Sequence, residues 1–162
     1  MTTIKRSALV MHAPEKMYQL VNDVASYPQF LPWCSDARVL ESSAEQMLAS
    51  IELHKGALRK RFTTRNTLSP GEAIELQLVD GPFRSLHGLW RFVPLGGGGA
   101  ASARGCKVAL EIEFEFDNAL LGRLVGPLFT QICSGLVDAF VARAEQLYGA
   151  GGGPVGGPGG GQ

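Results

Sequence analysis

The sequence predicts an α+β fold in which an antiparallel sheet of about seven strands packs against a long C-terminal helix. Between residues 46 and 116, apolar and polar side chains repeatedly alternate, which is typical of strands with one buried face. After Asn118, a plausible N-cap, the apolar residues recur at spacings of three and four, which indicates an amphipathic helix. A helix of this kind facing such a sheet forms a two-layer domain.

The length and composition favour one domain, which we place at residues 1–149. Residues 150–162 (AGGGPVGGPGGGQ) are predicted to be a disordered Gly/Pro-rich tail, and Gly96–Arg104 a mobile loop. The chain has 15 basic and 15 acidic residues, so attraction to a nucleic acid or a membrane would have to come from a local patch. No apolar run of membrane-spanning length and no signal-peptide core is visible, so we expect a cytoplasmic protein.

The first elements are read from residue 2 onwards. Thr2–Val10 is predicted to be a strand, and a helix is expected to begin near Pro14, because proline is tolerated in a first turn. An apolar helical face then runs to about Val24. Arg38–Glu41 is expected to add a short strand.

The segment VNDVASYPQFLPWC brings three aromatic residues, Tyr27, Phe30 and Trp33, close together around Pro28 and Pro32. The prolines exclude a continuous helix and predict an irregular apolar plug. The plug has two interpretations: a hydrophobic cover on the core, or the mouth of a pocket for an apolar ligand.

The predicted inner faces of the sheet and the long helix are unusually aromatic. On the helix, the apolar stripe is predicted to contain Leu121, Leu124, Val125, Leu128, Phe129, Ile132, Leu136, Phe140 and Leu147, and Gly126-Pro127 is expected to kink it. These residues either fill the core or line a mostly apolar ligand site. The candidate cavity residues are Tyr27, Phe30, Trp33, Phe62, Trp90, Phe92, Phe114, Phe116, Phe129, Ile132, Leu136 and Phe140. Small residues of the helix (Gly122, Gly126, Gly135 and Ala139) are expected to widen the space.

Several of these segments together resemble one family: the YPQFLPWC segment, VDGPF at residues 79–83, KVALEIEFEF and LVDAFVARAEQLYG. From about Thr3 to Gly149 the chain is similar to the coenzyme-Q-binding branch of the START-like (polyketide cyclase/dehydrase) superfamily. That branch includes mitochondrial ubiquinone-binding proteins and bacterial toxins that associate with the ribosome. The resemblance implies a START-like helix-grip fold, in which a curved sheet wraps around the C-terminal helix and encloses a cavity.

Residues 55–65 (KGALRKRFTTR) contain five basic residues and no acidic one: Lys55, Arg59, Lys60, Arg61 and Arg65. The three arginines are predicted to share one strand face. That face is either a solvated surface partly neutralised by Glu52 and Glu75, or a docking surface for phosphates of an anionic membrane or of ribosomal RNA.

No constellation for catalysis or metal binding is visible. The three histidines lack metal-ligand spacing, and Glu111, Glu113 and Glu115 are predicted to pair across strands with Lys5 and Arg91. Cys34, Cys106 and Cys133 form neither a disulfide framework nor a metal motif and are expected to be reduced thiols. We therefore predict no catalytic residues, no metal and no cofactor, although ubiquinone is a candidate bound ligand by resemblance.

The function predicted first is a non-enzymatic binding protein or chaperone for a hydrophobic molecule, by resemblance ubiquinone or another polyprenyl quinone, that supports respiration or quinone biosynthesis. The alternative is a toxin that binds a ribosomal subunit and inhibits translation initiation. A third interpretation, a cyclase or aromatase, lacks an acid–base pair. The basic segment leaves peripheral contact with the inner face of an anionic membrane open alongside the ribosome.

Overall fold

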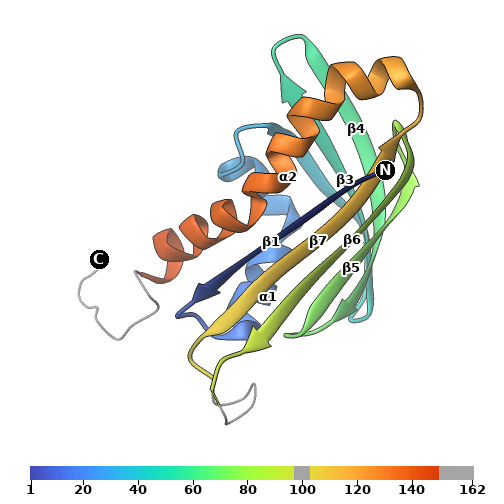
Figure 1. Cartoon of the computed structure of the whole chain (residues 1–162). Helices are drawn as coiled ribbons and strands as arrows, with labels where there is room; N and C mark the ends of the chain where they lie inside the picture. The colour runs from blue at the N-terminus through green and yellow to red at the C-terminus, as the bar shows by residue number, and fades with distance from the viewer. Residues whose placement is uncertain (97–102, 150–162) are drawn as a thin grey trace.

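Seven antiparallel strands form one sheet that curves around a long helix, as the computed structural model shows for residues 1–96 and 103–149 (Figure 1). The predicted tail and most of the predicted mobile loop lie outside these described residues. The strands are β1 (Thr2–Val10), β2 (Cys34–Ser42), β3 (Gln46–Lys55), β4 (Leu58–Ser69), β5 (Ala73–Asp80), β6 (Phe83–Pro94) and β7 (Cys106–Phe116). The helical elements are α1 (Pro14–Asn22), the 3₁₀ helix η1 (Val24–Gln29) and α2 (Ala119–Tyr148). The predicted fold class is confirmed.

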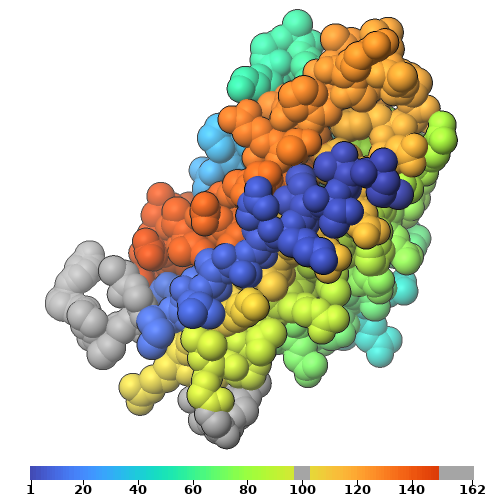
Figure 2. Space-filling view, in the orientation of Figure 1, coloured from blue at the N-terminus to red at the C-terminus, as the bar shows by residue number. Residues whose placement is uncertain are grey.

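The strand order is β1-β7-β6-β5-β4-β3-β2, so β1 is the one strand that does not pair with its neighbour in the sequence. Strands β2 to β7 pair with their chain neighbours as hairpins, whereas β1 pairs with β7 from Thr2 opposite Phe114 to Val10 opposite Cys106. On the surface shown in Figure 2, β1 runs beside α2. The first strand therefore joins the last one, and α2 packs across the concave side of the sheet.

Alternation places the predicted residues on the inner face of the sheet. Met47, Ala49 and Leu53 of β3 are buried, as are Leu86, Trp90 and Phe92 of β6. The Asp-Gly turn predicted between two strands joins β5 to β6. Gly81 has φ +147°, and a Cβ there would lie 2.6 Å from the Cβ of Phe62, so this close approach requires glycine.

Helix α2 begins at the predicted cap, where the Asn118 Oδ1 accepts a hydrogen bond from the Leu121 N–H at 2.8 Å. It continues as one helix through Pro127. The predicted apolar stripe was too wide: Leu124 and Leu147 are 67% and 52% exposed, because the sheet covers only the side that carries Val125, Phe129 and Phe140. By length and composition α2 is the one described helix that could cross a membrane, but its apolar side packs in the domain core.

Two groups of buried side chains stabilise the two ends of the layer between sheet and helix. One surrounds α1, η1 and the Trp90 and Phe140 rings. The other surrounds the Phe83, Phe114 and Phe129 rings. The candidate site lies where these two groups meet.

Candidate functional site

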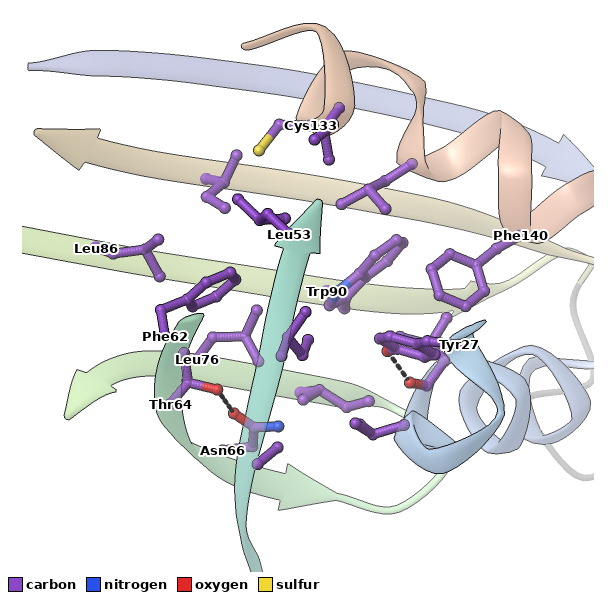
Figure 3. A pocket seen from close by; sticks show the side chains of 18 of the residues that line it. Tyr27, Leu53, Phe62, Thr64, Asn66, Leu76, Leu86, Trp90, Cys133 and Phe140 are labelled. Carbon is purple, nitrogen blue, oxygen red and sulfur yellow. Dashed lines mark hydrogen bonds between the residues drawn. The ribbon is translucent and has the colours of Figure 1, made fainter. Parts of the chain in front are cut away.

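A cavity of about 80 Å³ lies between the concave face of the sheet and α2 (Figure 3). Its wall is mostly apolar and is built by η1, β3–β7, α2 and the end of α1. The predicted residues that line it are Tyr27, Trp33, Phe62, Trp90, Phe129, Ile132, Leu136 and Phe140. The aromatic plug and the helix stripe therefore meet at one enclosed space.

Four predicted aromatic residues do not line this cavity. Phe30 packs on Phe140 and on Tyr27 at centroid distances of 5.3 and 6.2 Å, and the Arg143 guanidinium lies 4.9 Å from its ring centroid. Phe92 lies farther along β6 and packs on Tyr18 at 5.9 Å. Both side chains are packing residues around the end of the domain that holds α1 and η1.

Phe114 and Phe116 also lie outside the cavity wall. Phe114 packs edge-to-face on Phe129 at 4.7 Å, and Phe116 stacks on Phe83 at 4.8 Å. The predicted widening by Gly122 and Gly126 fails for the same reason, because positions 122 and 126 of α2 face the Phe116 ring. Alternation predicts the face of a strand but not how far along the strand the filled core extends.

The cavity contains a small number of polar groups. The Tyr27 hydroxyl donates to the Val21 carbonyl oxygen, and burial raises the pKa of Tyr27 far above its ordinary value. Deeper along β4, the Thr64 hydroxyl donates to the Asn66 Oδ1 at 2.7 Å (Figure 3). The sequence analysis missed Asn66, although alternation with Thr64 and Leu68 places it on the inner face.

The three cysteines are buried free thiols. Burial raises the pKa of Cys34 and of Cys106 to about 11, and that of Cys133, which lines the cavity, to about 12. Because the thiolate is the nucleophile, these thiols are inert near neutral pH. Within residues 1–96 and 103–149, no three His, Cys, Asp or Glu side chains are grouped to hold a metal ion.

An outer groove of about 500 Å³ lies on the other side of the cavity wall. Trp33, Ile132 and Leu136 line both the cavity and this groove, so their side chains separate the two spaces. The groove also contacts His54 and Lys55 at the end of β3, together with Gly135 and Ala139 of α2. The latter two therefore widen the groove and not the cavity.

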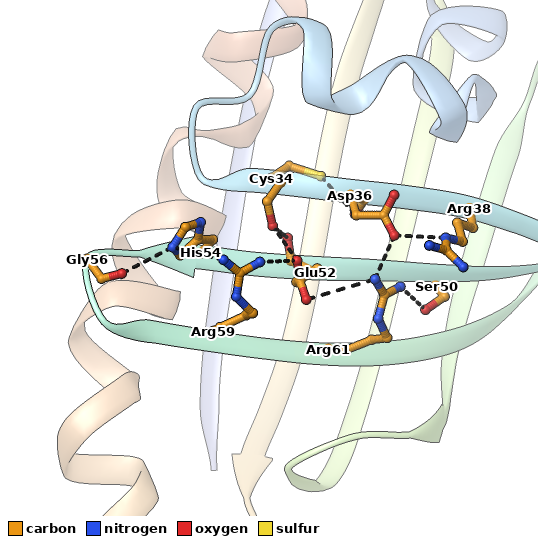
Figure 4. A network of polar contacts seen from close by, with 10 residues as sticks. Cys34, Asp36, Arg38, Ser50, Glu52, His54, Gly56, Arg59 and Arg61 are labelled. Atoms are coloured by element: carbon orange, nitrogen blue, oxygen red, sulfur yellow. Dashed lines mark hydrogen bonds and ion pairs between the residues drawn. The ribbon is translucent and has the colours of Figure 1, made fainter.

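The predicted arginine face is the outer surface of β4, where the arginines bind carboxylates (Figure 4). Arg59 pairs with Glu52 at 2.8 Å, and Arg61 pairs with Asp36 at 2.6 Å. The Arg61 hydrogen bond lowers the pKa of Asp36 below its ordinary value. Arg65 is 4.0 Å from Glu41. Neutralisation therefore comes from β2 and β3, and not from Glu75, which pairs with His87 on β6 at 2.7 Å.

The two lysines of the basic segment differ from the arginines. Lys60 is opposite Leu53 and Lys55 is opposite Leu58 in the β3–β4 register, so both lie on the helix side of the hairpin tip. Neither has a carboxylate within 4.0 Å among the described residues. These lysines, rather than the arginines, carry the uncompensated positive charge.

Two of the three glutamates of β7 pair across strands as predicted, one of them with a different partner, and Glu113 has no cation within 4.0 Å among the described residues. Lys5 and Glu111 are 3.7 Å apart, and Glu115 is 3.8 Å from Arg84. The predicted partner Arg91 is opposite Ala109 instead of a glutamate. These carboxylates are on the outer face, away from the cavity.

A seven-stranded antiparallel sheet that curves around one long helix, with a mostly apolar cavity between the two layers, is a helix-grip domain. Residues 10–141 match the family described as polyketide cyclase/dehydrase and lipid transport, and the chain belongs to this family. Two solved structures share the fold. They are a START superfamily protein from Mycobacterium smegmatis (TM-score 0.72, 20% identity, 90% of this chain and 98% of that one) and the Zhui aromatase/cyclase from Streptomyces sp. R1128 (0.75, 16%, 90% and 94%).

Within the family, this chain is similar to proteins named for ribosome association and, more distantly, to a protein named for coenzyme Q binding. It is 48% identical to the ribosome association toxin RatA of Pseudomonas aeruginosa, over 91% of this chain and 99% of that protein. It is 29% identical to the mitochondrial coenzyme Q-binding protein COQ10 homolog B of Xenopus laevis, over 83% of this chain and 54% of that protein.

Proposed function

We propose that this protein is a non-enzymatic factor that associates with the ribosome, binding one subunit and inhibiting translation initiation. The observation that carries the proposal is the 48% identity to a ribosome association toxin over nearly the whole of both chains. The relative named for coenzyme Q binding is more distant, at 29% identity. The higher identity to the toxin favours ribosome association over the quinone carrier that the sequence analysis ranked first.

The structure supports phosphate contact at the tip of the β3–β4 hairpin. Lys55 and Lys60 have no carboxylate partner among the described residues, so they can bind a polyanion without breaking an internal ion pair. Arg59 and Arg61 would first have to leave Glu52 and Asp36. Phe62 contacts Phe83 and Phe129 in the interior, so it is not available to stack on RNA bases. We expect contacts to the phosphate backbone of ribosomal RNA.

The test is co-sedimentation of the purified protein with isolated ribosomal subunits between about 50 and 200 mM salt. The variant Lys55→Gln/Lys60→Gln should bind less tightly, and the slope of log K against log salt should fall by about 1 for each lost phosphate contact. The matched control Arg59→Gln/Arg61→Gln should change the slope less, because these charges are neutralised within the protein.

Three results would contradict parts of this proposal. A wild-type protein that sediments with neither subunit at any salt concentration would exclude ribosome association. Binding to anionic vesicles but not to subunits would instead assign the lysines to membrane docking. Equal salt slopes for the wild type and the lysine variant would be compatible with ribosome association, but they would exclude a role for the lysines of the hairpin tip in it.

A second candidate function, binding of a hydrophobic ligand such as a quinone, is favoured by the cavity itself. Its volume of about 80 Å³ is below the 300–1,000 Å³ typical of drug-sized sites, so it suits a ring or a short chain segment. A longer polyprenyl tail would extend past Trp33 into the outer groove. Mass spectrometry of lipids that co-purify with the protein should find a near-stoichiometric quinone; a lipid-free protein would speak against this function.

A further inference from the structure

We propose that the Asn66 side-chain amide selects the ligand of the cavity by donating a hydrogen bond to an oxygen acceptor, such as a carbonyl, of an otherwise apolar molecule. The inference rests on the second candidate function above. It names the chemical group that the cavity recognises and the residue that recognises it.

Asn66 is a polar side chain in an apolar wall. It belongs to β4, is only 3% exposed, and lines the cavity together with Ile74, Leu76 and Trp90. An amide carries two acceptor sites and two N–H donors, and burial without partners is costly for such a group. A residue chosen only to fill this space would be apolar.

Thr64 determines which end of the amide is left for a ligand. Its hydroxyl donates to the Asn66 Oδ1 at 2.7 Å, and Thr64 is itself buried. The bond uses the carbonyl end of the amide and leaves the NH₂ group, for which no hydrogen bond is found among the described residues. In Figure 3 the nitrogen of Asn66 points away from Thr64 along the row of cavity side chains. Thr64 is therefore a positioning residue, and Asn66 offers the N–H donors of its amide to a ligand in the cavity.

The side chains around Asn66 determine the charge and polarity of the rest of the ligand. Trp90, Phe62 and Phe140 provide flat aromatic surfaces, and no charged side chain lines the cavity. A charged ligand would be buried without a counter-charge, which is strongly unfavourable. The geometry fits a neutral, largely apolar ring or chain with a hydrogen-bond acceptor at one end, and it disfavours both a plain hydrocarbon and an anionic lipid head group.

The experiment compares two small probes that differ only in their oxygens: duroquinone (tetramethyl-1,4-benzoquinone) and durene, the corresponding tetramethylbenzene. Equilibrium dialysis gives the affinity of each probe for the wild-type protein, for Asn66→Leu and for Thr64→Val. Leu86→Val is the control, because it shortens an apolar wall residue and should weaken both probes alike. Circular dichroism establishes that each variant is folded.

The ratio of the two affinities is the decisive quantity. We expect Asn66→Leu to reduce the preference for duroquinone over durene by about tenfold, the size of one buried hydrogen bond, without weakening durene. Thr64→Val should reduce the preference less, because the amide stays but is no longer held. An unchanged ratio in Asn66→Leu would overturn the role of Asn66 while leaving ligand binding intact. If the wild-type protein binds neither probe, the ligand-binding function itself fails, and this inference with it.

Discussion

Trp90 and Phe114 are buried aromatic residues of neighbouring strands, but only Trp90 contacts the cavity. Phe114 contacts Phe83, Phe116 and Phe129 instead. Replacing either residue with alanine should lower the free energy of unfolding by about 3–5 kcal/mol. We expect Trp90→Ala also to weaken duroquinone binding at a temperature where both variants are folded, whereas Phe114→Ala should not. Urea unfolding and equilibrium dialysis measure the two effects, and equal loss of binding in both variants would contradict this division.

His12 makes stability depend on pH. Its ring is 3% exposed, neither ring nitrogen has a hydrogen-bond partner, and it packs beside Tyr148. Burial lowers its pKa below the ordinary value of 6.5; Lys16 lowers it further, and Glu145 acts in the opposite direction. The folded state thus binds fewer protons than the unfolded state in this range. The contribution of neutral His12 is complete above pH 6.5 and is lost as the pH falls towards the lower pKa of the folded protein.

Urea unfolding from about pH 8 down to about pH 5.5 should therefore show a decrease in stability on the acid side. The variant His12→Leu removes the titrating ring and should flatten that decrease. A pH dependence as steep in His12→Leu as in the wild-type protein would assign it to other groups. An NMR titration of the His12 ring gives the direct check, since its midpoint should lie below 6.5.

At the level of elements, Asn118 fixes where α2 begins. Its side chain accepts the Leu121 N–H, one of the helix donors that have no partner within the helix. Asn118→Ala should cost about 1 kcal/mol and lower the melting temperature by about 2–4 °C. Asn118→Asp keeps the acceptor and is the matched control. A melting temperature unchanged in Asn118→Ala would show that packing of α2 alone sets its start.

The elements of this fold could be predicted because their signals are local. Alternation gives each strand its buried face, and a cap followed by a 3.6-residue period gives α2. Properties that depend on register could not be predicted. The pairing of Arg61 with Asp36, 25 residues away, follows from how β2, β3 and β4 align. Likewise, the cavity ends where the stacked rings of Phe83 and Phe116 fill the space between sheet and helix, and no periodicity in the sequence predicts this stack.

At the level of the whole molecule, the two proposed functions meet at the β3–β4 hairpin tip. Lys55 carries uncompensated charge and also lines the outer groove beside Trp33. A ribosomal subunit bound to the tip should cover part of the groove. We expect bound duroquinone to dissociate more slowly from the protein–subunit complex than from the free protein, as stopped-flow recovery of tryptophan fluorescence measures. Equal dissociation rates would show that docking leaves the groove open.

The side chains of Trp33, Ile132 and Leu136 form a partition between the inner cavity and the outer groove. A guest molecule that passes between the cavity and the groove must displace at least one of them. The partition then sets how long a guest stays, while the wall behind it sets how strongly it is held. Trp33→Leu should accelerate entry and exit, because a smaller side chain then separates the two spaces. Substitution of Trp33, which follows η1, should therefore change how long the protein retains a guest and leave the Asn66 amide that recognises the guest in place.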